Sequence, residues 1–472
     1  MTMLFGAAFG LPAGAVDLGA PLHPAYAGDP LHVDPPLLHT GSVLPGDMQP
    51  VPCAQATRDL TPELSLAEAV DIALCANPTV QAAWADIKQQ ASAVGVAKAA
   101  YLPSVQGSVS GLSDHTWYPD GGGTNSMDQG IKAHATLVWR LLDFGGREAK
   151  LAASQHLLAA AVATHDATLQ ATMASVIQAY FDAETAEAAL VARQQEASIA
   201  ASTLDTAQRK KAEGKGSEND VLQAQTRVAY ARLGVSRAMG SLVKAKAVVA
   251  YALGAPPGTT LTLTALAPPK TGELSRSLAE WLEVAQQHHP SIAAAREQVA
   301  AAQDHAREVR SQALPTLDFK ASVYENGRPS QTLGQSREAV VGVTLNVPLF
   351  DGFSRSYKVQ GADAAVEERA AELHKAELRV GLDVVEAYSD ATAALKNLDA
   401  SDALLKSASA SLDSAQRKYQ KSSSEDVLDI LNSQKALADA QEERIRCLSE
   451  WHSASLRIMA AAGQLGIAEL DQ

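Results

Sequence analysis

The sequence predicts a mainly α-helical fold built from two tandem repeats, each with a β-hairpin followed by long coiled-coil helices. Each half contains two segments in which polar and apolar residues alternate, and these are followed by a stretch of about 65 residues without proline. Landmarks also recur at a constant spacing of 212 positions, which indicates two structurally equivalent halves. These pairs are Leu66 and Leu278, Pro78 and Pro290, and Pro103 and Pro315.

The composition argues against several classes of protein. The formal net charge of −14 and the pI near 5.3 disfavour nucleic-acid binding, which needs a basic surface. Aromatic residues make up only 5%, while alanine dominates an apolar fraction of 46%. Small side chains at this density suit long helices whose backbones approach closely. No run of 18 apolar residues predicts a transmembrane helix, but strands that cross a membrane are short and alternating and escape this test.

The first 63 residues lie outside the repeats. Residues 1–27 are mostly apolar or small, and Ala25-Tyr26-Ala27 fits a signal-peptidase site, so we expect an export signal. The basic residues that normally open such a signal are missing, so we expect its true start to be mis-assigned. A disordered N-terminal tail is the alternative. Residues 28–63 contain many prolines without periodicity, which indicates an extended linker.

The chain has three cysteines, Cys53, Cys75 and Cys447. In an oxidising compartment, a disulfide between Cys53 and Cys75 would fasten the linker to the first helix. Three free thiols are the alternative. No Cys/His spacing typical of a metal site is present, so we expect neither a metal nor another cofactor.

Each repeat is expected to open with two successive helices. Residues 65–68 and 277–280 have the Ser-x-x-Glu pattern of a capping box, in which the serine and glutamate satisfy free backbone groups of the first turn. A proline then interrupts each pattern. Because proline favours the first turn of a helix, we expect a second helix over 78–100 and 290–313.

Alternating segments follow the second helix in each repeat. They cover about 105–111 and 131–140 in the first repeat, and 317–323 and 341–347 in the second. A period of two with one polar and one apolar face is typical of a half-buried strand. Strands of about ten residues cross an outer membrane when they are tilted. Loops are expected at 114–130 and 326–336.

The longest predicted elements are helices over residues 147–212 and 354–421, which contain no proline and almost no glycine. A helix of this length spans about 100 Å at about 1.5 Å per residue, which suits a coiled coil or a tube. A turn and a returning helix follow in each half, over 220–253 and 426–462. These patterns bound the repeats at 64–264 and 265–472.

Four strands are too few to close a membrane barrel, since the smallest outer-membrane barrels have eight. Open strand edges also cannot face lipid, because their backbone groups would lack hydrogen-bond partners. If the strands cross a membrane, the chain must therefore oligomerise. A ring of three copies would supply twelve strands.

This order of elements resembles the TolC family of outer-membrane efflux and secretion channels over about residues 60–465. The twin Leu-Ala-Glu…Asn/His-Pro openings, the Leu-Pro-Ser/Thr strand starts and the strand exit Pro348-Leu349-Phe350-Asp351-Gly352 carry the resemblance. The returning helices match through Asp220-Val221-Leu222-Gln223-Ala224-Gln225 and Asp429-Ile430-Leu431-Asn432-Ser433-Gln434. Each motif is weak alone, but the motifs occur twice and in the right order.

The resemblance implies a homotrimer, with a twelve-stranded β-barrel in the outer membrane of a Gram-negative bacterium and an α-helical barrel across the periplasm. It implies a periplasmic adaptor, an inner-membrane ABC or other transporter, and outer-membrane lipid as partners, with no enzymatic activity. The cysteine pair and the overall pattern are most similar to the type I secretion branch, which exports unfolded proteins such as the RTX toxins, cyclolysin among them. Export of drugs is the alternative within the family, and a coiled-coil scaffold is the alternative from another class.

The tips of the helical hairpins are the candidate functional site. Aspartates constrict the periplasmic mouth in the resembling family, and this role falls here to Asp426 and Asp429, with Asp220 in the first repeat. Trimer symmetry would turn each into a ring of three carboxylates, which favours cations. An ordinary solvated helix face, with acids near the helix N-terminus, is the alternative. The candidates for contacts between neighbouring coils are Arg209, Arg417 and Tyr419.

The turns at these tips are the predicted docking surface for the adaptor. Gly214 and Ser217 match the glycine and the small hydroxyl residue that the family uses at the first tip. The second tip departs from the pattern, because Ser422 and Ser423 lie there without a glycine. A simple turn that needs a positive φ at Gly214 is the alternative.

Overall fold

The computed structural model describes residues 31, 33, 63–118, 126–256, 258–264, 276–326, 336–421 and 427–466. The predicted export signal and nearly all of the predicted linker lie outside these residues. The first half contains α1 (Leu66–Ala76), α2 (Pro78–Ala99), β1 (Ser104–Thr116), β2 (Ser126–Leu142), α3 (Gly146–Ala212) and α4 (Glu218–Ala252). The second half contains α5 (Leu278–His288), α6 (Pro290–Ser311), β3 (Thr316–Asn326), β4 (Ser336–Asn346), α7 (Ser354–Lys421) and α8 (Val427–Ala461).

The two halves agree element by element. Corresponding short helices have 11 residues, the second helices 22 and the returning helices 35, while the long helices α3 and α7 have 67 and 68. The prediction of a mainly helical chain with two tandem repeats is therefore confirmed. Within the described residues, no helix combines the length and the apolar character that a membrane crossing requires.

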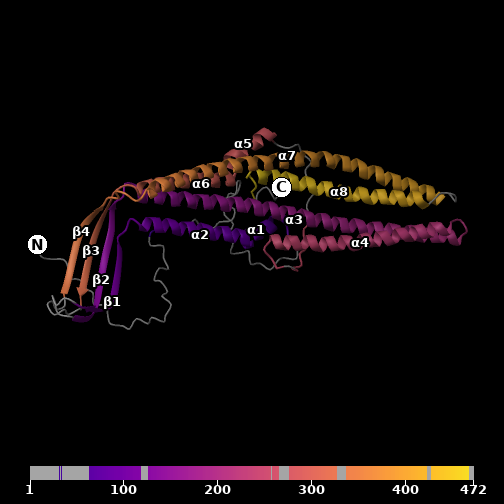
Figure 1. Ribbon diagram of the computed structural model, residues 1–472. Helices are drawn as coiled ribbons and strands as arrows, with labels where there is room; N and C mark the ends of the chain where they lie inside the picture. The colour runs from indigo at the N-terminus through magenta and orange to yellow at the C-terminus, as the bar shows by residue number, and fades with distance from the viewer. Residues whose placement is uncertain are drawn as a thin grey trace.

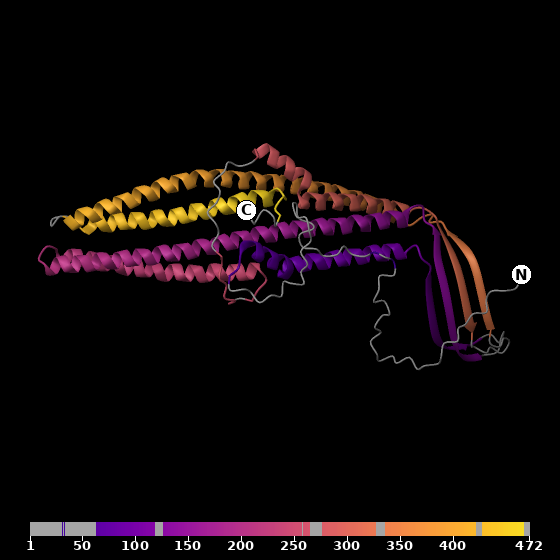
Figure 2. The same ribbon diagram turned by 180° about the vertical axis from the view of Figure 1, so that it is seen from behind.

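The molecule is elongated, with the sheet at one end and the helical hairpins at the other (Figure 1). The long helices α3 and α7 run from the sheet towards the tips. α2 and then α4 lie along α3, while α6 and then α8 lie along α7, as the view from behind also shows (Figure 2). The α3–α4 and α7–α8 tips lie together, far from the sheet. The predicted tip residues are therefore gathered at one end.

The helix starts agree with the predicted capping boxes. The side chains of Ser65 and Ser277 accept from the backbone N–H groups of Glu68 and Glu280, and each glutamate accepts in return. Both second helices begin at the predicted proline. The residue before each proline, Asn77 ahead of α2 and His289 ahead of α6, caps the helix by accepting from a backbone N–H two positions later.

Each returning helix ends against the start of the second helix of its own repeat. The Asn77 side-chain amide donates to the carbonyl oxygen of Ala252, at the end of α4, over 2.9 Å. Gly254 and Gly463 follow the returning helices at φ +75° and +69°. A Cβ on Gly463 would lie 2.9 Å from Pro290 Cδ. These glycines allow α4 to continue the line of α2, and α8 that of α6, so each repeat presents two long antiparallel rods.

Mild acid should weaken the α8–α6 junction, because His289 can accept the capping hydrogen bond only while its imidazole is neutral. Nδ1 of His289 accepts from the Ser291 N–H at 3.1 Å, and burial lowers the pKa of His289 while the Asp383 charge partly opposes this. Stability from the neutral ring is complete above the unfolded pKa of about 6.5 and is lost as pH falls below it. His289→Asn copies the cap of the first repeat, so the variant should lose less stability than the parent between pH 7.5 and 5.5 in urea titrations.

The control for this experiment is His452, whose pKa burial also lowers. Because His452 is retained in the His289→Asn variant, some acid sensitivity should remain. Equal loss of stability in parent and variant would show that the α6 cap does not contribute to the pH dependence.

The four strands form one antiparallel sheet in the order β1-β2-β3-β4. Its register mostly sets apolar residues opposite apolar residues and polar residues opposite polar ones on neighbouring strands. Val105 opposes Leu137, Val323 opposes Ala135, and Val341 opposes Ala321. Directly opposed residues share a face, so one face is apolar across all four strands. The other face carries the polar partners, such as Ser108 against His134 and Thr136 against Ser322. The predicted two-faced hairpins are therefore confirmed.

The predicted loop over 114–130 is wrong at both ends. β1 continues to Thr116 and β2 begins at Ser126, and these two residues still oppose each other. A ladder is made by backbone groups, so it continues through polar residues that interrupt the alternating pattern. β1 and β2 thus have 13 and 17 residues, whereas β3 and β4 have 11 and agree with the predicted length.

The bulky core lies midway along the molecule, where α1 and α5 pack on the long helices. In the first repeat Tyr180 is fully buried, and its hydroxyl donates to the carbonyl oxygens of Leu64 and Thr264. In the second repeat Trp281, Ile292 and Val384 form a separate cluster. Elsewhere the helices meet largely through alanine, as the composition predicts.

Cys75 in α1 is disulfide-bonded, while Cys447 in α8 is a buried free thiol. Cys53 lies outside the described residues, so the Cys53–Cys75 pairing stays a prediction. We expect peptide mapping without reductant to recover residues 53 and 75 in one linked peptide and to recover Cys447 alkylated after unfolding. A linkage to Cys447, or recovery of all three as thiols, would contradict the pairing.

Candidate functional site

The first hairpin tip is a tight turn closed by backbone hydrogen bonds. After α3, the N–H of Gly214 donates to the Lys211 carbonyl and that of Lys215 to the Lys210 carbonyl, the pattern of a Schellman motif. Gly214 has φ +73°, as this motif requires. A Cβ on Gly216 would meet Lys210 Cβ at 3.1 Å, so the turn also packs closely on α3.

Ser217 and Asp220 form a reciprocal cap at the start of α4. The Asp220 N–H donates to Ser217 Oγ at 3.1 Å, and the Ser217 N–H donates to Asp220 Oδ2 at 3.0 Å. Both predicted site residues therefore have a structural contact, and Ser217 remains exposed at the tip. The carboxylate of Asp220 is stabilised there by the free N–H groups of the helix terminus.

Tyr419 links the two hairpins near their tips. It is buried beside Val427 and Ile430, and Lys210 of α3 places its ammonium 3.5 Å from the ring centroid while donating to the Tyr419 carbonyl. Burial raises the pKa of the Tyr419 hydroxyl, and the nearby negative charge of Asp220 raises it further. The structure thus brings together Tyr419, Asp220 and Lys210. Sequence reasoning missed Lys210, although it ends the four-residue motif Ala-Gln-Arg-Lys at 207–210, which recurs at 415–418 in the second half.

The remaining predicted site residues do not join this cluster. Arg209 is largely exposed and pairs with Asp205, one turn earlier on the same helix. Arg417 is exposed on α7, and Asp429 is exposed in the first turn of α8. Asp426, Ser422 and Ser423 lie outside the described residues. Within the described part of the chain, no group of three or more His, Cys, Asp or Glu side chains could hold a metal ion.

At the end of the sheet nearest the helices, an ion pair and a hydrogen bond link polar side chains of β2, β3 and β4. Arg140 of β2 pairs with Asp318 of β3 at 3.0 Å, and Asn346 of β4 donates to the other Asp318 oxygen at 3.0 Å. Asp318 is buried despite its charge, which is satisfied by these partners. One apolar sheet face, one polar sheet face and a long helical body whose tips lie at the far end are the features expected of a membrane channel protein.

The comparisons with known proteins agree with this class. The family model described as outer membrane efflux protein matches residues 69–255 and 281–464, one segment in each half. Protein CyaE of Bordetella pertussis is 35% identical over 417 residues, covering 88% of this chain and 87% of that protein. The alkaline protease secretion protein AprF of Pseudomonas aeruginosa is 26% identical over 273 residues, covering 56% of this chain and 55% of that protein.

A solved structure shares the fold. The outer membrane protein VceC from Vibrio cholerae superposes with a TM-score of 0.73 at 19% identity, covering 84% of this chain and 96% of that one. The chain belongs to the outer membrane efflux protein family. It is an exit channel of the Gram-negative outer membrane that extends into the periplasm, in a family of channels rather than enzymes.

Proposed function

We propose that three copies of this chain form the outer-membrane duct of a tripartite machine for type I secretion of proteins. The observation that carries the trimer is the open sheet. β1 and β4 each pair on one side only, and an apolar face runs across all four strands. Lipid offers no hydrogen bonds to such edges, so β1 of one copy pairs with β4 of the next until twelve strands close.

The helical body supports the same arrangement. α2 and α4 follow one outer side of the four-rod layer and α7 the other, because α3 lies between α4 and α8. Copies joined at the sheet edges therefore bring α7 of one chain beside α2 and α4 of the next. This would extend the barrel of strands into a barrel of helices across the periplasm, with the hairpin tips as its mouth.

Within this duct, Asp426 and Asp429 line the closed mouth. Asp220 belongs to the same gate, because its carboxylate lies near Tyr419. Tyr419 and Lys210 hold the two coils of one copy together, while the exposed Arg209 and Arg417 contact a neighbouring copy. The exposed turn at Gly214 and Ser217 and the second turn with Ser422 and Ser423 meet a periplasmic adaptor, which links the duct to an inner-membrane transporter.

A secreted protein is the proposed cargo because of the similarity to an alkaline protease secretion protein and the resemblance to the secretion branch. Deleting the gene should remove at least one protein from the culture medium while leaving sensitivity to drugs and dyes unchanged. Reintroducing the gene should restore secretion. An unchanged secretome together with increased drug sensitivity would overturn protein export and favour small-molecule efflux.

A further inference from the structure

α4 carries a column of tyrosine and basic side chains at every seventh position. Tyr230, Arg237, Lys244 and Tyr251 lie one above the next, because seven residues make nearly two full turns of a helix. The two tyrosines are 66% and 81% exposed, and both cations are exposed as well. These four residues, the α4 column, extend over about 30 Å at about 1.5 Å per residue.

The second repeat does not share this column. α4 and α8 begin at residues 218 and 427, so corresponding positions differ by 427 − 218 = 209. In α8 these positions hold Asp439, Arg446, Ser453 and Ala460, with no tyrosine and with charges of both signs. The column is therefore a property of α4 and not of the helical framework that the two repeats have in common.

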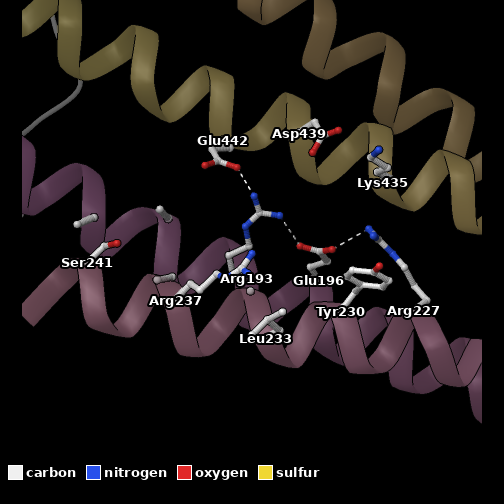
Figure 3. Close-up of a pocket in the computed structure, with 14 residues that line it drawn as sticks. Arg193, Glu196, Arg227, Tyr230, Leu233, Arg237, Ser241, Lys435, Asp439 and Glu442 are labelled. Carbon is white, nitrogen blue, oxygen red and sulfur yellow. Dashed lines mark hydrogen bonds and ion pairs between the residues drawn. The ribbon is translucent and has the colours of Figure 1, made fainter.

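Tyr230 and Arg237 line a groove of about 470 Å³ over α3, between α4 and α8 (Figure 3). The two glutamates of this groove already have partners. Glu196 accepts from Arg193 of α3 at 2.8 Å and from an arginine of α4 at 2.7 Å, and Arg193 also pairs with Glu442 of α8. These ion pairs join the three helices and neutralise the negative charge of both glutamates.

The charges that stay unpaired around the column are mainly positive. Arg237 and Lys244 of α4 and Lys435 of α8 are exposed, and none of them forms an ion pair with a residue that the structure describes. Asp439 is the one acid of the groove lining in the same condition. A wall with three unpaired cations and one unpaired acid attracts carboxylates, although the chain as a whole has a net charge of −14.

The column points away from the short helices. Ala250 is fully buried in the cluster where α1 packs on α3 and α4, whereas the next residue, Tyr251, is 81% exposed. Consecutive residues differ by about 100° around a helix, so the column turns away from α1. α5 packs beside Tyr388 of α7 as α1 packs beside Tyr180 of α3, at corresponding positions of the long helices (388 − 180 = 354 − 146 = 208). Both short helices therefore lie on one side of the layer.

That side is the outside of the proposed trimer. Neighbouring helices pack about 8–10 Å apart, so a ring of twelve rods is about 35 Å across between opposite axes and about 25 Å across inside. Six further helices, each about 10 Å thick, do not fit in this space. α1 and α5 of the three copies must then lie outside the ring, and the α4 column lines its lumen.

A neighbouring copy covers a different side of α4. Val228 and Ala231 pack on α3. Gly240 and Ala247 lie on the side opposite these residues, both exposed, and this is the side that meets α7 of the next copy. The column lies between the two sides, so it stays open to the lumen.

We propose that the α4 column is a contact track for the exported polypeptide, and that it takes extended segments in which carboxylates recur. The proposal rests on the proposed function, which supplies an exported protein inside the duct. Arg237 and Lys244 are about 10 Å apart along the helix, which equals about three residues of extended chain at about 3.3 Å each. Acidic residues about three positions apart match the two cations, and apolar side chains near them pack on the tyrosines. Each contact is weak, as passage through a channel requires.

Photocrosslinking in cells tests the track. The photoreactive residue p-benzoylphenylalanine is placed at position 230, or at position 243 as the matched control. Val243 is 66% exposed, like Tyr230, but it precedes Ala250 by seven positions and so lies on the α1 side. The target is the protein that disappears from the medium when the gene is deleted. Position 230 should cross-link to this protein during export, and position 243 should not.

A measurement with a defined anion tests the charges. Poly-L-glutamate added at the sheet end of the full-length channel in a planar bilayer should reduce the current. R237E should raise the half-blocking concentration at least about fivefold at low salt, because it reverses one cation of each column. R232E is the control, since Arg232 is an exposed arginine of the same helix that lies about 140° around it from Arg237. Its half-blocking concentration should stay within about twofold of the parent.

The outcomes separate this proposal from the proposed function. Cross-links from position 230 to another copy of the chain, or equal block of R237E and R232E, would overturn the track and leave the trimeric duct standing. An unchanged secretome after deletion of the gene would overturn protein export. The poly-L-glutamate measurement needs no exported protein, so it decides for or against the column in that case as well.

Discussion

Replacing Gly463 by alanine is expected to lower the free energy of unfolding by about 3 kcal/mol. Two costs add. The residue has φ +69°, where a side chain costs about 1–2 kcal/mol. Its new Cβ would lie 2.9 Å from Pro290 Cδ and 3.1 Å from His289 Cα, and forcing atoms into a packed site costs typically 1–3 kcal/mol. The junction of α8 with α6 would have to open.

Gly254→Ala should behave in the same way, because its Cβ would lie 2.7 Å from the Ala76 carbonyl oxygen in the first repeat. Urea titrations of the detergent-solubilised protein, followed by circular dichroism, measure both effects. Gly214→Ala separates the two costs, since Gly214 has φ +73° with open space around the new Cβ, and it should cost only about 1–2 kcal/mol. Equal losses for Gly214→Ala and Gly463→Ala would show that close packing does not hold the junction.

Removing the mouth aspartates should change conduction more than any other substitution at the tips. In a trimer, Asp426→Ala with Asp429→Ala removes two rings of three carboxylates. Crowded rings of this kind attract cations strongly. The double variant should therefore show higher single-channel conductance in planar bilayers. The concentration of a divalent cation that halves the current should rise at least about tenfold, which corresponds to about 1.4 kcal/mol of lost attraction.

Asp413→Ala provides the control for the mouth. Asp413 is an exposed aspartate of α7 near the same end of the molecule, outside the predicted gate. Its removal changes the net charge of each copy without touching either predicted ring, so block should change less than twofold. If the double variant is blocked like the parent, or if Asp413→Ala has the same effect, the assignment of Asp426 and Asp429 to the gate is wrong.

The helical framework was predictable because local signals mark its ends. Two capping boxes and two prolines locate the starts of the short helices, and the absence of proline locates the long ones. Each capping box and each proline acts within one turn of the chain. The strand ends were less predictable, because β1 and β2 continue through residues such as Thr116 and Ser126 by backbone pairing, which leaves no trace in the alternation.

Contacts between distant helices were not predictable from the pattern. Lys210 reaches Tyr419 across 209 positions, and Arg193 reaches Glu442 across 249. The sequence offers many charged residues at helical spacing, and only the relative position of α3, α7 and α8 selects these pairs. Gly254 and Gly463 could have been noticed as a repeated pair. Their role depends on the close approach of α1 and α6, which a single sequence does not reveal.

The number of copies in the purified channel tests the central claim most directly. Native mass spectrometry of protein extracted from the outer membrane in detergent should show one species with three copies of the chain. Particles imaged under the same conditions should contain a closed twelve-stranded barrel. A single copy that stays in solution without detergent would contradict the account, as would an assembly of any other number of chains.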